Sequence, residues 1–145
     1  MIAVKRLELA RLRVCQRCGR GGAELRGTDG ELVIVPLDAV RTRQLRDEPN
    51  DVHSLTELVL EQLRASGLAP SEVVLDVVDG KLHALFSLVR GEEHDVVDCT
   101  ADEGVALALR GGLNLYATDE ALAHAAARSG KAQRHGRPQG PGTVH

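Results

Sequence analysis

The 145-residue sequence contains very few aromatic side chains. Phe86 and Tyr116 are the only two, and there is no tryptophan. Proteins that bind single-stranded nucleic acid stack bases on aromatic rings, and each stacked base contributes about 1–3 kcal/mol. That mode of binding is therefore not expected here. The core must be aliphatic, which is feasible because 43% of the residues are hydrophobic.

The sequence also has no long apolar segment. No stretch approaches the 18 apolar residues that are typical of a membrane-spanning helix, and residues 1–13 lack the apolar region of a signal peptide. Three cysteines, an odd number, argue against a disulfide framework. Phosphate-loop, dinucleotide-binding and nucleophile-elbow motifs are absent, so no organic cofactor is expected. We expect a cytoplasmic protein without a membrane partner.

The charge is unevenly distributed along the chain, although the net charge is only -3. Residues 1–46 carry ten Lys and Arg against five acids, whereas residues 47–128 carry sixteen acids against five bases. The basic residues 1–46 are compatible with phosphate binding. The acidic residues 47–128 would repel phosphate unless a bound metal ion offset their charge. The alternative is that the two regions form ordinary solvated faces of opposite sign.

The periodicity of apolar residues predicts an α+β domain built from hairpins, with a mixed or antiparallel sheet and about three helices. Residues 19–22 are expected to lie in a loop. Hairpin turns are expected at residues 28–30 and 79–80, the second of type I′ because it contains Asp-Gly. The predicted strands cover residues 2–9, 31–36, 73–78, 81–89, 94–98 and 113–117, and the predicted helices cover residues 54–66, 101–110 and 119–128.

Capping residues define the helix starts. Ser54 with Glu57, and Thr100 with Glu103, have the spacing of a capping box, and Thr118 is expected to cap the last helix. The predicted apolar face of helix 54–66 consists of Leu55, Leu58, Val59 and Leu63. Residues 129–145 are rich in glycine, proline and basic residues, which predicts a disordered tail after a single domain at 1–128.

Cys15 and Cys18 have C-x-x-C spacing on a glycine-rich turn, which corresponds to half of a zinc site. A structural zinc site needs four ligands. A reversible disulfide and unpaired loop cysteines are the alternatives. The remaining zinc ligands would be Cys99 with one of His53, His83 and His94, or the same cysteine pair of a second chain.

Two strings carry a resemblance to a known family: VVLDVVDGKLHALFSLV at residues 73–89 and VVDCTADEGVALALRGGLNLYATDEAL at residues 96–122. Their hairpin, short alanine- and leucine-rich helix, glycine stop and apolar strand follow one another as in the bifunctional nuclease domain family. Members of this family are bacterial and plant proteins credited with RNase and DNase activity. The sequence resembles a divergent member over roughly residues 2–123.

The resemblance implies a nuclease that cleaves RNA or DNA phosphodiesters with Mg²⁺ or Mn²⁺ held by carboxylates. Glu57, Asp102 and Glu103 stand at family-matched or adjacent positions and are therefore the candidate catalytic residues. Two family residues are replaced: Thr100 stands where the family has arginine, and Thr56 where it has histidine. No neighbouring residue in the sequence obviously replaces this arginine as a phosphate clamp.

A second interpretation explains the same residues without catalysis. Glu57 and Glu103 are accounted for as capping acids, which contribute about 1 kcal/mol each. The chain would then be a catalytically silent relative that binds a protein partner or acts in regulation, with a zinc- or redox-sensitive C-x-x-C loop. In either case we expect a homo-oligomer, with nucleic acid or a protein as its partner.

Overall fold

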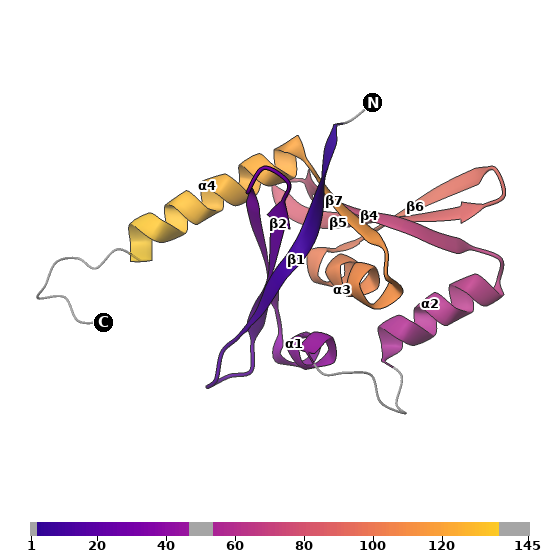
Figure 1. Cartoon of the computed structure of the whole chain (residues 1–145), viewed down its shortest axis with the longest axis horizontal. Helices are drawn as coiled ribbons and strands as arrows, with labels where there is room; N and C mark the ends of the chain where they lie inside the picture. Colours follow the sequence, from indigo (N-terminus) through magenta and orange to yellow (C-terminus); the bar gives the residue numbers. More distant parts are fainter. Residues whose placement is uncertain (1–2, 47–53, 137–145) are drawn as a thin grey trace, which may run out of the picture.

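A computed structural model describes residues 3–46 and 54–136 of the chain. It confirms the predicted α+β class, with seven strands and four helices in the described part (Figure 1). The strands are β1 Val4–Val14, β2 Gly21–Gly27, β3 Leu32–Leu37, β4 Ala69–Val78, β5 Lys81–Arg90, β6 Glu93–Thr100 and β7 Asn114–Thr118. The helices are α1 Ala39–Arg46, α2 Leu55–Ala65, α3 Ala101–Gly111 and α4 Asp119–Gly136.

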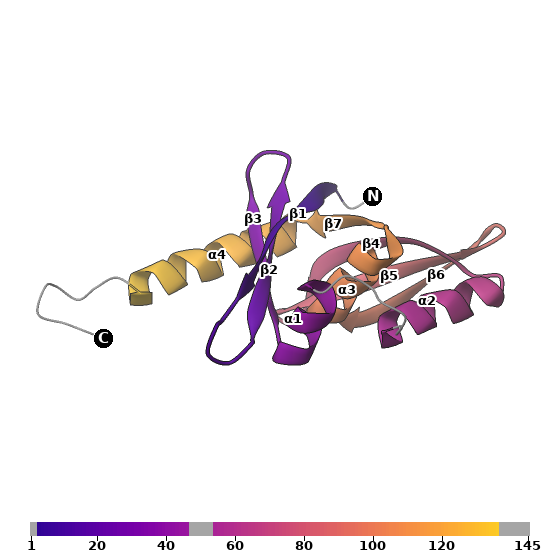
Figure 2. The ribbon, with the colours of Figure 1, turned by 60° about the horizontal axis from the view of Figure 1, so that its bottom comes forward.

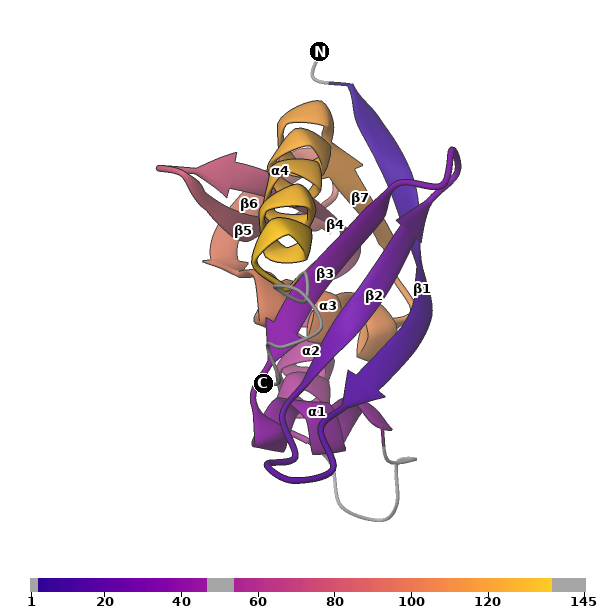
Figure 3. The same cartoon turned by 90° about the vertical axis from the view of Figure 1, so that its left-hand side faces the viewer.

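All seven strands form one sheet in the order β3-β2-β1-β7-β4-β5-β6. Every neighbouring pair is antiparallel except β4 and β7, which are parallel. Figures 1 and 2 show α1, α2 and α3 next to one another and α4 apart from them. Helix α4 lies along β3 in Figure 3 and also contacts β4 and β7. None of the described helices is both long enough and apolar enough to cross a membrane.

Helix α3 packs at the centre of the molecule, against β3, β4, β5, β6 and β7. Its residues Gly104, Val105 and Ala108 are buried. At Gly104 the helix comes so close to β5 that an added Cβ would lie 2.1 Å from the Cβ of Ala84. Small residues at this crossing therefore set the distance between the helix and the sheet.

The predicted turn chemistry is confirmed at residues 79–80. Asp79 (φ 51°) and Gly80 (φ 76°) both have positive φ, as a type I′ turn requires, and they connect β4 to β5. Gly112 adopts the left-handed conformation (φ 64°) and ends α3, as the glycine stop predicts.

Two of the three predicted helix caps are present. The Ser54 hydroxyl accepts the backbone N–H of Glu57 (3.3 Å) at the start of α2. The Thr118 hydroxyl accepts the N–H of Ala121 (3.1 Å) at the start of α4. The predicted capping box at α3 is wrong, because Thr100 occupies the N-cap position but its side chain makes no capping hydrogen bond.

The region around the first hairpin differs from the prediction. Strand β1 continues to Val14, because it resumes pairing with β2 after an irregularity between Leu9 and Arg11. Gly21 belongs to β2 rather than to a loop. A Cβ there would lie 2.0 Å from the carbonyl oxygen of Arg13, so the strand pairing itself requires glycine. Helix α1 was not predicted because its mostly polar sequence, AVRTRQLR, has no apolar periodicity.

Helices α2 and α4 also differ from the prediction. Leu55, Leu58 and Val59 of α2 are exposed, whereas Leu60 is its buried residue (2% exposed). Leu63 of the predicted face is partly buried against the core, so the face that packs against α3 and β4 is displaced from the predicted one and shares this residue with it. Helix α4 continues to Gly136, beyond the predicted end at residue 128. The rest of the predicted tail, residues 137–145, lies outside the described residues.

The contact between Gly104 and Ala84 predicts that Gly104→Ala destabilises the protein. The added methyl group overpacks the interface between helix and sheet, so we expect a loss of about 1–3 kcal/mol in the free energy of unfolding. Urea denaturation measures it. The variant Gly104→Ala/Ala84→Gly restores the space and should recover part of the loss. An unchanged unfolding midpoint for Gly104→Ala would contradict the close packing.

The Thr118 hydroxyl predicts a second effect on stability. It caps α4 and also donates to the Asp76 carboxylate (2.7 Å), and Thr118 is 3% exposed. Thr118→Val keeps the shape and removes both hydrogen bonds, so we expect a loss of about 1–2 kcal/mol in thermal or urea denaturation. Thr118→Ser retains the hydroxyl and should lose much less. Equal losses for the two variants would assign the effect to packing.

Candidate functional site

A cleft of about 310 Å³ lies between α1, α2 and the first half of α3. Its walls combine charged and polar side chains with an apolar rim. The lining residues are Asp38, Val40, Arg41, Gln44, Leu55, Thr56, Val59, Glu103 and Leu107. Another cavity of about 340 Å³, between α4, β3 and the β4–β5 turn, is lined by Lys81, His124 and Arg128 but by no acid. Only the first cavity therefore combines an arginine with carboxylates.

Arg41 is the central polar residue of the cleft. Its guanidinium donates to the Thr56 hydroxyl (3.0 Å) and to the Gln44 side-chain oxygen (3.4 Å). Its Nε lies 3.7 Å from Oδ2 of Asp102. The Arg41 side chain is 18% exposed, so this charge lies within the cleft wall. Arg41 of α1 thus contacts both α2 and α3.

Arg41 is not among the site residues predicted from the sequence, because the helix that carries it, α1, was not predicted either. Asp38 precedes α1, and its carboxylate accepts the N–H of Arg41 (2.7 Å). The Thr42 hydroxyl donates to the carbonyl of Asp38 (2.6 Å). An aspartate three residues before the arginine is a helix-start signal that would have placed Arg41 in the first turn. Arg41 is far from Thr100 in the sequence, but the fold brings its guanidinium close to Asp102.

The predicted catalytic residues do not all reach the cleft. Asp102 faces Arg41, and Glu103 lines the cleft wall. Glu57 is at the start of α2, where its carboxylate accepts the Ser54 hydroxyl (3.2 Å), and it is not among the lining residues of the cleft. The structure thus places Asp102 beside Arg41 and Glu103 in the wall of the cleft that Arg41 also lines, and it leaves Glu57 at the cap.

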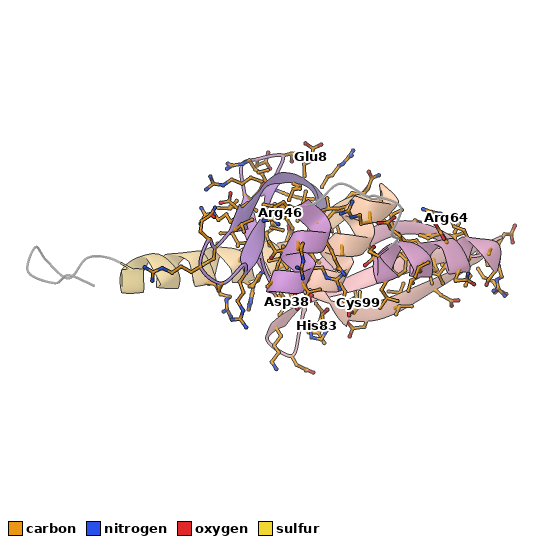
Figure 4. The ribbon with its side chains drawn as sticks, turned by 90° about the horizontal axis from the view of Figure 1, so that it is seen from below. Glu8, Asp38, Arg46, Arg64, His83 and Cys99 are labelled. Carbon is orange, nitrogen blue, oxygen red and sulfur yellow. The ribbon has the colours of Figure 1, made fainter. Side chains whose placement is uncertain are left out.

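A shallow hollow adjoins the cleft on the other side of Glu103. It is lined by His83, Val97, Asp98, Cys99, Thr100 and Glu103. His83 Nδ1 lies 2.9 Å from Oδ1 of Asp98, so a carboxylate holds the imidazole in place. Figure 4 shows Asp38, His83 and Cys99 on the same side of the molecule. The start of α3 thus separates two hollows that both contain ionisable side chains.

Three basic residues of the N-terminal third, Lys5, Arg11 and Arg13, are paired with acids away from the cleft. Lys5 binds Asp29 (2.7 Å) and Glu31 (2.6 Å). Arg11 and Arg13 both bind Glu24, and the Arg11 side chain lowers the pKa of the Glu24 carboxyl. These pairs fix strands of the sheet to one another. Neighbouring carboxylates therefore offset the charge of these three side chains.

The predicted zinc ligands lie in separate places. Cys15 and Cys18 are exposed in the β1–β2 turn, whereas Cys99 lies in β6, the edge strand at the other side of the sheet. Within the described ranges, no three His, Cys, Asp or Glu side chains are placed to hold one metal ion. His53, one of the predicted fourth ligands, lies outside the described residues. A zinc site completed by a second chain stays a prediction.

The thiols differ in their surroundings. Cys99 donates to the carbonyl of Ala84 (3.5 Å). Burial raises the pKa of Cys99 to about 11, with further contributions from Glu103, Asp98 and Asp102. The pKa of Cys15 is lowered, first by the backbone N–H of Cys18, then by the Cys18 thiol and the N–H of Arg17.

These directions predict the order of thiol alkylation. Only the thiolate reacts, so a thiol with a pKa of about 11 is ionised in about one molecule in a thousand at pH 8. We expect iodoacetamide to modify Cys15 well before Cys99 at pH 8, as measured by peptide mass spectrometry over time. Raising the pH to 10 should accelerate modification of Cys99 far more than that of Cys15. Equal rates at pH 8 would contradict the different environments.

Comparisons with known proteins do not assign a family to this chain. No protein-family model matches the sequence, and a search of curated proteins also finds no match. The resemblance to the bifunctional nuclease family therefore stays a prediction.

Proposed function

We propose that this chain is a bifunctional-nuclease-like domain that cleaves RNA or DNA phosphodiesters in the cleft between α1, α2 and α3. One observation carries the proposal: Arg41 of α1 and Glu103 of α3 line the same cleft, and Asp102 of α3 pairs with Arg41. A guanidinium binds phosphate oxygens in a fixed geometry, and carboxylates hold the divalent ions used in phosphodiester cleavage. Phosphodiester cleavage by this mechanism requires a guanidinium and carboxylates in the same cleft.

Two carboxylates at the cleft would hold a divalent ion of the Mg²⁺ or Mn²⁺ type in this proposal. Asp38 and Glu103 both line the cleft. Mg²⁺ in such sites is typically bound by one or two carboxylates together with water and substrate phosphates, so a cage of protein ligands is not needed. When bound, the ion would polarise a phosphate oxygen and lower the pKa of an attacking water. Glu103 and Asp38 would hold it.

The remaining polar groups have distinct roles in this proposal. Arg41 binds a phosphate oxygen, and Asp102 and Thr56 position its guanidinium. The positive end of the helix dipole at the start of α3 stabilises the carboxylates of Asp102 and Glu103 in its first turn. His83, oriented by Asp98, is the candidate to transfer a proton in the adjoining hollow.

A second candidate function is binding of a protein partner without catalysis. The rim of the same cleft is apolar and open: Leu55 is 72% exposed, Val40 55% and Val59 41%. Neighbouring exposed aliphatic side chains are typical of protein interaction sites. Under this alternative, Arg41 and Glu103 provide charge complementarity to the partner rather than chemistry.

The nuclease proposal predicts the effect of two substitutions in the cleft. Glu103→Gln and Arg41→Gln should each lower the metal-dependent cleavage of single-stranded RNA and DNA at least tenfold, because each removes a charge that acts on the phosphate. Circular dichroism should stay native. Glu92→Gln, an exposed glutamate in the β5–β6 turn, is the matched control and should cleave at the wild-type rate.

Two outcomes would contradict the proposal. Cleavage that survives both substitutions and excess chelator would indicate a contaminant or another site. No cleavage by the wild-type protein with Mg²⁺ or Mn²⁺ would leave the protein-binding function as the better account.

A further inference from the structure

The β1–β2 turn has a defined backbone geometry around its two cysteines. The N–H of Cys15 donates to the carbonyl of Arg20 (2.6 Å), and the N–H of Gly19 donates to the carbonyl of Cys15 (2.9 Å). Gly19 has a left-handed conformation (φ 76°), which lets the chain turn back directly after Cys18. The pair is therefore held on a closed turn rather than on an irregular loop.

Both cysteines of this turn are exposed. The two backbone hydrogen bonds that close the turn hold Cys15 and Cys18 on one short segment, three positions apart. This arrangement, with a left-handed glycine after the second cysteine, supplies two adjacent ligands for a tetrahedral zinc ion.

The described part of the chain offers no ligands to complete that tetrahedron. A structural zinc ion takes four protein ligands, and no third His, Cys, Asp or Glu in the described ranges is placed to share a metal with another two. Cys99 lies in the edge strand β6, and its thiol donates to the carbonyl of Ala84. Two turns of this kind, however, supply the four thiolates of a Cys₄ site.

We propose that the β1–β2 turn is half of an intersubunit zinc site, in which Cys15 and Cys18 of two copies of this chain bind one Zn²⁺. Zinc binding replaces the thiol protons, which are released to solvent, and no redox partner is required. This proposal does not rest on the nuclease function.

Exposure and charge favour a second copy as the partner. Cys15 and Cys18 are exposed, and Figures 1 and 2 show the turn at the outer end of the β1–β2 hairpin. Four thiolates and one Zn²⁺ carry a net charge of about -2. Arg17 and Arg20 are exposed on the same turn, so each chain brings two positive charges to the site. These arginines offset the charge of the cluster in the dimer.

The test is a zinc titration of the full-length, untagged protein under reducing conditions, followed by sedimentation velocity. We expect about one zinc ion per two chains and a dimer that dissociates when a chelator is added. X-ray absorption should show four sulfur neighbours at about 2.3 Å. Cys15→Ser/Cys18→Ser should lose both the zinc and the zinc-dependent dimer, and the matched control Cys99→Ser should keep both.

Several results would overturn the proposal. These are one zinc ion per monomer, nitrogen or oxygen ligands, no stable zinc binding, or a dimer whose mass does not respond to zinc. Conversion of Cys15 and Cys18 to an intrachain disulfide, with no zinc bound by the reduced protein, would identify a redox pair instead. Because none of these measurements uses nucleic acid cleavage, failure of the nuclease proposal and failure of the zinc proposal are distinguishable.

Discussion

The close approach of α3 to the sheet is the contact on which the rest of the structure depends. It is possible because Gly104 and Ala84 are both small, and an added methyl group would bring two Cβ atoms within 2.1 Å. A core nearly without aromatic side chains suits this geometry, since aliphatic residues fill a narrow space between helix and sheet. Glu103 directly precedes Gly104, so the same contact fixes a carboxylate at the border of both hollows.

A glutamate near the start of a helix can either contact the helix cap or line a functional site. Two glutamates occupy the fourth position of a capping-box motif. Glu57 contacts its serine at the start of α2 and is not among the residues that line the cleft. Glu103 has the same spacing from Thr100, but the threonine makes no capping bond, and Glu103 lines the cleft beside Arg41. The motif alone does not distinguish these outcomes, because both glutamates fit it equally well.

The predictions from the sequence succeeded where the signal is local. The turn at Asp79 and Gly80, the left-handed Gly112 and the capping hydroxyls of Ser54 and Thr118 each depend on a few adjacent residues. The predictions were wrong where contacts with residues distant in the sequence determine the structure. Gly21 belongs to a strand because β1 passes too close for a side chain, and Leu55 of α2 is exposed because the neighbours of that helix cover another face.

The sequence by itself therefore determined the α+β class, most of the element positions and the exposed C-x-x-C turn, since hydrophobic period, capping and turn residues act over short distances. Only the tertiary structure placed Arg41 against Asp102, because these residues are 61 positions apart and lie on helices that meet through packing. It also separated Cys99 from Cys15 and Cys18. Strand order, which no local pattern encodes, puts β1 in the middle of the sheet and β6 at its edge.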